Sequence, residues 1–387
     1  MLLSKLVSYK PPLLPATMKK LRLCITVVAL ILSFCAHAAA QHRTDTSQPR
    51  SSVGVNLFYG FFIANQPKSL YLRDDHSRLI ELNYFLPTTG RRQWEAESNF
   101  PRVGVGLLHG STGSRQYLGT VTALYPFIHF PLLRTLRSET SFKLGAGFGW
   151  VQKPYNKETN YKNLMIGTHI NAVIAMRMES EWAISSHLFV NVGLAFTHLS
   201  NGGIRLPNLG LNIPALSVGA RLATQSSQFA KRHSAGLLSL KKTSLYLHAN
   251  FALKQVYPLE SSLKPVYILI AELNRTLSNV STISGGLNLS YDKSLFKEVV
   301  NAPTYIFNKD EPQLQASIYG GYEQVTGRLS IPVQFGVYIY NKYAISTVYQ
   351  MIGIRYKVSA KWTASVQLKT HFGKADYIQY GIGYKIF

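Results

Sequence analysis

A histidine and a serine stand two residues apart in the segment FTHLSNGGIRLPNLGLN, residues 196–212. If this segment is extended, His198 and Ser200 lie on one face with their Cα atoms about 7 Å apart. A histidine at that spacing can take the proton of a serine hydroxyl and make it a nucleophile. The run NGG at residues 201–203 follows at once, and a turn there would free backbone N–H groups to bind an oxyanion. The alternative is that both residues merely end a strand where polar residues meet a membrane surface.

The longer pattern H-x-S-N-x-G-x(3)-P-N-x-G, residues 198–210, resembles the motif of the lipid A 3-O-deacylases, the PagL-type acyloxyacyl hydrolases. That family consists of outer-membrane β-barrel esterases that remove an acyl chain from lipopolysaccharide. Matched position by position, the resemblance implies site roles for five residues of this chain. They are Ser200 as nucleophile, His198 as base, Asn208 and the backbone of Gly203 as oxyanion-hole donors, and Asn201 as a supporting residue.

The position of the family's third catalytic residue departs from the pattern. The resemblance places a glutamate twelve residues after the serine, where this chain has Asn212. An amide can hold a histidine in one tautomer, but it cannot stabilise imidazolium by charge. A carboxylate from elsewhere, such as Glu81, Glu179 or Glu181, could replace it. The other possibility is that the chain kept the loop and lost the reaction.

The charge balance separates into a removable leader and a cationic remainder. The 387 residues carry 41 Lys and Arg against 18 Asp and Glu, a net charge of +23, yet only 15% are charged. Residues 18–40 (MKKLRLCITVVALILSFCAHAAA) have the basic start, apolar stretch and small-residue end of a secretory signal peptide. We therefore expect residues 1–40 to be removed, with translation starting at Met18.

Removal of this leader changes both the charge and the cysteine content. It takes away five basic and no acidic residues, so 36 basic residues face 18 acidic ones, a net of +18. Both cysteines, Cys24 and Cys35, leave with it, which excludes disulfides and thiolate chemistry in the mature chain. The eleven histidines show no metal-ligand spacing, so no metal or cofactor is expected.

Alternation of apolar and small or polar residues recurs along the rest of the chain and predicts strands with one apolar face. No apolar run after residue 41 approaches the roughly 20 residues that a membrane helix needs. About sixteen candidate segments can be marked, from which we expect 12–16 strands. The segments are residues 53–64, 77–87, 102–110, 116–130, 139–151, 164–178, 183–199, 213–224, 243–256, 264–275, 280–291, 313–323, 331–340, 344–358, 361–373 and 377–387.

Two architectures fit such strands after a signal peptide: a secreted sandwich or soluble barrel, and a barrel in the bacterial outer membrane. The second is favoured because the non-apolar face is built of Gly, Asn, Ser and Gln, and because aromatic residues gather near the strand ends. The fold prediction is all-β, an antiparallel transmembrane β-barrel. Residues 41–387 are expected to form a single barrel, in which 51–224 resembles the deacylase barrel and 225–387 adds strands.

Three functions remain open at this point. The resemblance implies a Ser/His esterase that hydrolyses an ester-linked acyl chain of lipid A. The strand number also suits a porin-like channel, and Asn212 also suits a lipopolysaccharide-binding barrel without catalysis. The expected partners are lipopolysaccharide and the outer membrane of a Gram-negative bacterium, because a cationic, charge-poor chain with a leader suits anionic lipid A phosphates better than nucleic acid. The sequence does not determine the oligomeric state.

Overall fold

Strands form where the sequence alternates, because successive side chains of an extended chain point to opposite sides. A computed structural model describes residues 51–63, 67–224, 242–257, 262–295, 313–341, 346–372 and 374–387. These ranges contain sixteen strands, and each of the sixteen expected segments overlaps one of them. Within the same ranges no helix is long and apolar enough to cross a membrane. The expected leader, with Cys24 and Cys35, lies outside the described residues.

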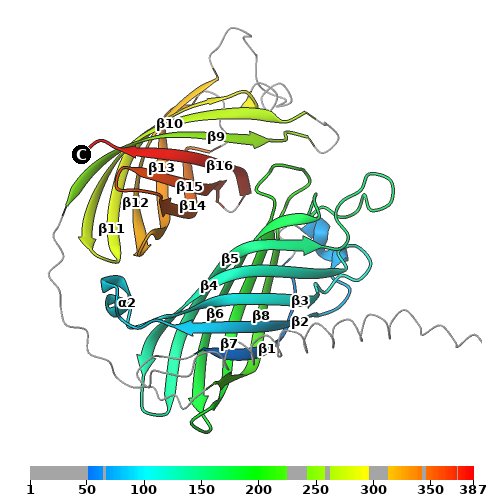
Figure 1. Cartoon of the computed structure of the whole chain (residues 1–387). Coiled ribbons are helices and arrows are strands. Elements are labelled where there is room, and N and C mark those ends of the chain that lie inside the picture. Colours follow the sequence, from blue (N-terminus) through cyan, green and yellow to red (C-terminus); the bar gives the residue numbers. More distant parts are fainter. Residues whose placement is uncertain are drawn as a thin grey trace, which may run out of the picture. The chain divides into compact units, whose positions relative to one another are not determined.

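The first eight strands form a closed antiparallel barrel in which each strand pairs with the next (Figure 1). A short 3-10 helix, η1 (Pro67–Leu72), and a short α-helix, α2 (Gln93–Glu97), lie in its connections. The strands are β1 (Ser52–Gly60), β2 (Ser77–Pro87), β3 (Arg102–Ser111), β4 (Thr120–Arg134), β5 (Ser138–Val151), β6 (Ile170–Ala183), β7 (Leu188–Ser200) and β8 (Leu211–Ala223).

The last eight strands form a second closed antiparallel barrel, in which β9 pairs with both β10 and β16. Its strands are β9 (Thr243–Lys254), β10 (Lys264–Ser278), β11 (Ser281–Asp292), β12 (Leu314–Thr326), β13 (Leu329–Asn341), β14 (Val348–Lys357), β15 (Trp362–His371) and β16 (Lys374–Lys385).

The expectation of one barrel for residues 41–387 is therefore wrong, and hydrogen bonding explains why. All nine residues of β1 pair with β8, from Ser52 opposite Ala223 to Gly60 opposite Ala215. This pairing uses the edge of β8 to which further strands would have to add. The other eight strands can avoid an unpaired edge only if they close into a barrel of their own. The alternating pattern is the same for one barrel of sixteen strands and for two barrels of eight.

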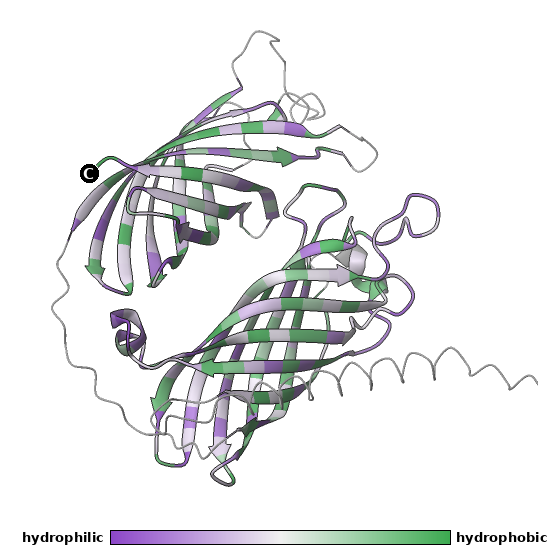
Figure 2. Cartoon of the chain, viewed as in Figure 1, coloured by the Kyte–Doolittle hydropathy of each residue, from purple (hydrophilic) through white to green (hydrophobic). Residues whose placement is uncertain are grey.

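The apolar side chains of the strands face outward in both barrels. Along β8 the outward Leu216 and Val218 are 64% and 56% exposed, whereas the inward Ser217 is 3% exposed. In the second barrel the outward Leu269 is 61% exposed and the inward Ile268 is 1% exposed. Hydrophobic and hydrophilic residues alternate along the strands of both barrels (Figure 2). This is the pattern of a barrel with lipid outside and a filled interior.

The two ends of the first barrel differ in the length of their connections. At the end where β1 begins, residues 135–137 and 184–187 make tight turns, and residues 88–101, which include α2, form one longer connection. At the opposite end, residues 152–169 form a long loop, residues 112–119 join β3 to β4, and residues 201–210 join β7 to β8. Outer-membrane barrels have short turns on the periplasmic side and long loops on the outer side.

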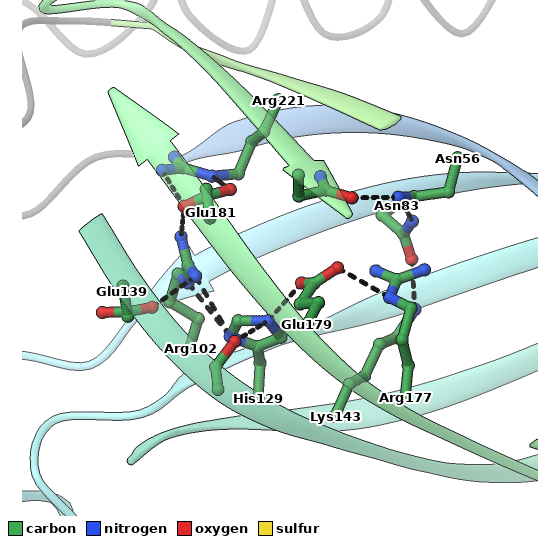
Figure 3. A network of polar contacts seen from close by, with 12 residues as sticks. Asn56, Asn83, Arg102, His129, Glu139, Lys143, Arg177, Glu179, Glu181 and Arg221 are labelled. Carbon is green, nitrogen blue, oxygen red and sulfur yellow. Dashed lines mark hydrogen bonds and ion pairs between the residues drawn. The ribbon is translucent and has the colours of Figure 1, made fainter. Parts of the chain in front are cut away.

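Charged side chains fill the interior of the first barrel (Figure 3). Glu81 accepts hydrogen bonds from Lys143 Nζ at 2.7 Å, from Arg177 Nη1 at 2.5 Å and from the Tyr125 hydroxyl. Asn83 Nδ2 also donates to Glu81, at 2.9 Å. Because Lys143 and Arg177 both pair with the Glu81 carboxylate, part of the desolvation cost of these charges is offset within the network.

A second part of the same network lies nearer the short turns. Glu181 pairs with Arg102 at 3.0 Å and with Arg221 at 2.8 Å, and Glu179 pairs with His129 at 2.6 Å. Four cations and four carboxylates of the barrel interior are each at most 8% exposed. They are Arg102, Lys143, Arg177 and Arg221, and Glu81, Glu139, Glu179 and Glu181.

We predict that Glu81→Gln destabilises the first barrel by about 3–5 kcal/mol, because Lys143 and Arg177 lose the carboxylate that pairs both buried cations. Urea unfolding of the refolded barrel in lipid vesicles, followed by tryptophan fluorescence, measures this change. The matched control is Glu158→Gln, which removes a loop carboxylate whose side chain is 78% exposed and should leave stability unchanged. Equal unfolding curves for Glu81→Gln and the unmodified chain would contradict a stabilising role for the network.

Candidate active site

His198 and Ser200 lie at the end of β7 next to the long loops, and both belong to the outward-facing series of that strand. Val192 and Leu194 of the same series are 54% and 65% exposed, whereas the inward Leu199 is fully buried. On the neighbouring strand β6, His198 is paired with Ile174. The pair therefore continues the apolar outer face, as the alternation predicts.

Asn212 lies directly beside His198 on the neighbouring strand. The register of β7 and β8 pairs the two residues, and His198 Nδ1 is 2.6 Å from Asn212 Oδ1. A carbonyl oxygen only accepts, so the proton of the neutral imidazole is on Nδ1 and the lone pair is on Nε2. This is the tautomer that a general base needs. Of the residues expected to form a triad, Asn212 and His198 are thus in direct contact.

Gly210 leaves room for this imidazole. Its φ is +77°, and a Cβ built on it would lie 3.0 Å from His198 Cε1. A larger residue at this position would be strained and would press on the histidine ring. The glycine of the motif thus has a structural reason that the motif alone does not reveal.

Two hydrogen-bond donors converge on the Ser200 hydroxyl. Asn208 Nδ2 donates to Ser200 Oγ at 2.8 Å, and the backbone N–H of Gly202 donates to it at 3.0 Å. The backbone N–H of Gly203, the expected second oxyanion donor, instead donates to Asn201 Oδ1 at 3.1 Å. The sequence has two adjacent glycines that could supply an N–H group. The resemblance implies Gly203, whereas the structure places the N–H of Gly202 next to the Ser200 hydroxyl.

Asn201 organises the loop that holds these donors. Its side-chain Nδ2 donates to the carbonyl oxygen of Arg205 at 2.8 Å and to Thr168 Oγ1 at 3.2 Å. Its backbone N–H donates to Asn208 Oδ1 at 3.2 Å. This bond fixes the orientation of the Asn208 amide group, whose nitrogen then donates to Ser200. The supporting position expected for Asn201 thus corresponds to three specific contacts.

Buried apolar side chains support the loop from inside the barrel. Leu199 and Leu211, which flank the loop, are fully buried together with Met165 and Ile166 of the neighbouring loop. The backbone N–H of Gly210 donates to the carbonyl oxygen of Met165 at 3.0 Å. The loop at 152–169 therefore fixes the position of the strand end from which Asn212 reaches His198.

The three carboxylates suggested as substitutes for the missing glutamate lie on the wrong side of the barrel wall. Glu81, Glu179 and Glu181 are buried in the lumen, where they pair with buried cations. Figure 3 shows Glu179 and Glu181 among these cations. Residues 179 and 181 belong to the inward series of β6. His198 belongs to the outward series of β7 and therefore points away from both carboxylates. Asn212 is accordingly the residue that orients His198. Among the described residues, no group of three or more His, Cys, Asp or Glu side chains could hold a metal ion.

Two family models match the chain. Residues 78–221 match the lipid A 3-O-deacylase (PagL) model, and residues 243–387 match the acyloxyacyl hydrolase, C-terminal domain model. The first match contains the whole His198–Asn212 segment, and the second spans the eight strands of the second barrel. No curated protein matches the chain significantly.

The solved structures found by comparison include porins and siderophore receptors, all with low similarity. The KdgM porin is 6% identical, with coverage of 86% of this chain and 99% of the porin, at a TM-score of 0.19. A mutant of the Rh. blastica porin is 11% identical, with coverage of 87% and 99%, and the siderophore receptor PirA from Pseudomonas aeruginosa is 9% identical, with coverage of 89% and 82%; both have a TM-score of 0.19. These scores are too low to support any argument about function.

The family assignment thus depends on the two family models, which together match most of the chain. Both models describe ester hydrolases. The protein belongs to the lipid A 3-O-deacylase (PagL) family of ester hydrolases, and its role is lipid A deacylation.

Proposed function

We propose that this chain is a Ser/His esterase of the Gram-negative outer membrane that hydrolyses an ester-linked acyl chain of lipid A. Ser200 is the nucleophile, His198 is the general base, and Asn212 orients the imidazole. The observation that carries the proposal is the 2.6 Å contact between His198 Nδ1 and Asn212 Oδ1. It leaves Nε2 as the basic nitrogen of a histidine that shares the outer face with Ser200.

The reaction begins when the Ser200 hydroxyl attacks the ester carbonyl carbon and its proton passes to His198 Nε2. The carbonyl oxygen becomes negatively charged in the tetrahedral intermediate. Asn208 Nδ2 and the N–H of Gly202 already contact Ser200 Oγ, which is bonded to the same carbon in that intermediate, so they are placed to stabilise the oxyanion. The N–H of Gly203 can contribute once it leaves Asn201 Oδ1.

The second half of the reaction returns the proton. Imidazolium at His198 protonates the departing sugar oxygen, and the C–O bond of the ester breaks. Water then attacks the acyl-serine with His198 again as base, which releases the fatty acid and restores Ser200. Asn212 keeps the ring orientation through both steps but adds no negative charge, so its contribution is smaller than that of a carboxylate.

The location of the site supports lipid A as the substrate. The hydroxyl and imidazole face the apolar exterior at the end of the barrel with long loops, which lies at the outer leaflet in outer-membrane barrels. Lipid A places its acyl chains in that leaflet and its phosphates at the surface. An expected mature charge of +18 favours contact with those phosphates.

Replacement of the nucleophile tests the mechanism. Ser200→Ala should reduce fatty-acid release from purified lipopolysaccharide by roughly 10³-fold or more, because no other group takes the acyl chain. Mass spectrometry of the released acid and of the remaining lipid A measures the effect. Ser180→Ala is the matched control, since Ser180 faces outward near the short turns. Undiminished release by Ser200→Ala would refute the mechanism.

Replacement of Asn212 tests the orienting contact. Asn212→Glu supplies a carboxylate that stabilises imidazolium and should raise kcat by on the order of 10-fold or more. Asn212→Ala removes the acceptor for Nδ1–H and should lower kcat. Steady-state deacylation rates of the two variants measure both changes. If the natural chain releases nothing and only Asn212→Glu is active, the chain is a lipopolysaccharide-binding barrel rather than an enzyme.

The porin-like alternative was motivated by a strand number that suits a wide, water-filled barrel. Two eight-stranded barrels have interiors that side chains fill. In the second barrel Glu272 accepts hydrogen bonds from Arg355 at 2.7 Å, from Tyr319 at 2.7 Å and from Gln334 at 2.9 Å. Amide contacts then extend through the lumen, from Gln379 to Gln367 at 2.9 Å and from Gln367 to Gln334 at 3.1 Å.

We therefore predict that the protein forms no ion channel. The purified chain in a planar bilayer should give no single-channel current above the bare membrane, because charged and amide side chains occupy both lumens. A general porin inserted in the same bilayer provides the positive control. Stable conductance steps that scale with salt concentration would reinstate the porin-like function.

A further inference from the structure

The residue beside the nucleophile on the next strand is an alanine. Strand pairing places Ala172 of β6 directly opposite Ser200, and Phe148 of β5 directly opposite Ala172. All three belong to outward-facing series. Adjacent strands are about 4.8 Å apart, so the phenyl ring rises roughly 10 Å from Ser200 with only one methyl group between them.

The side chains around this alanine are larger and extend toward the exterior. Phe148 is 73% exposed, and Leu124, which is paired with it on β4, is 58% exposed. Ile174 lies opposite His198, two residues along β6 from Ala172. An acyl chain attached at Ser200 would thus pass over the small side chain of Ala172 and contact the larger apolar side chains of Phe148 and Ile174.

The other side of Ser200 is occupied by polar groups. Asn208 and the N–H of Gly202 contact its hydroxyl, and His198 and Asn212 lie toward β8. These groups suit the ester oxygens and the proton transfer, not a hydrocarbon chain. The chemistry of the two sides therefore directs the acyl chain over β6 and the sugar toward the loop.

We propose that Ala172 and Phe148 are specificity-determining residues, which admit a long saturated acyl chain over the outer face of β6 and β5. This inference is based on the proposed function, with Ser200 as the nucleophile. Each methylene group that moves from water onto the apolar wall strengthens binding roughly fourfold. Contact with Phe148 should therefore favour long chains, and the small size of Ala172 should be needed for them to pass.

The test is to compare Ala172→Phe with the natural chain on two esters of the same alcohol, one butyryl and one tetradecanoyl. The phenyl ring fills the space beside Ser200, so kcat/KM for the long ester should fall at least about 10-fold more than kcat/KM for the short one. Phe148→Ala should weaken the preference for the long ester in the same direction, mainly through KM. Folding of each variant is checked by the heat-dependent mobility of the barrel in gel electrophoresis.

Ala220→Phe is the matched control, because Ala220 is also an outward-facing alanine but pairs with Val190 and Val55, away from Ser200. It should leave the ratio of the two kcat/KM values unchanged. The proposal is overturned if Ala172→Phe affects both esters equally or not at all, or if Ala220→Phe gives the same selective loss. Activity that survives in Ser200→Ala overturns the proposed function instead, so the two failures are distinguishable.

Discussion

Closure of the backbone hydrogen-bond ladder is the constraint on which the rest of this structure depends. Lipid offers no partner to an unpaired N–H or C=O group, so a spanning sheet must leave no open edge. The pairing of β1 with β8, and of β9 with β16, meets this requirement twice. Closure also assigns each residue to one of two faces by its parity along the strand. The proposed roles of His198, Ser200 and Asn212 all depend on that division.

The two faces have opposite chemistry in the same barrel wall. Inside, four buried carboxylates, Glu81 among them, are matched by four buried cations. Outside, His198 and Ser200 interrupt an apolar surface at the level where the long loops begin. One residue along β7 separates the faces, since Leu199 between the two polar residues is buried in the interior.

Short-range features of the sequence predicted the fold and the site better than long-range ones. Alternation located all sixteen strands, and the thirteen-residue motif located the His198, Ser200 and Asn208 contacts, because both depend on neighbouring residues. The number of barrels depends on whether β8 pairs with β1 or β9, which alternation does not encode. The choice between Gly202 and Gly203 depends on the turn formed around Asn201. Glu179 and Glu181 do not take the place of the missing glutamate, because their parity along β6 puts both carboxylates inside the barrel.

In the proposed mechanism Ser200, activated by a histidine that Asn212 holds, forms the acyl-enzyme. The most direct measurement is labelling with a long-chain alkyl fluorophosphonate, which traps an activated serine, followed by peptide mass spectrometry of the folded protein. We expect one adduct, on Ser200, whose formation slows in Asn212→Ala and disappears in His198→Ala. An adduct on another residue, or lipid A deacylation that continues at full rate after Ser200 is labelled, would contradict this mechanism.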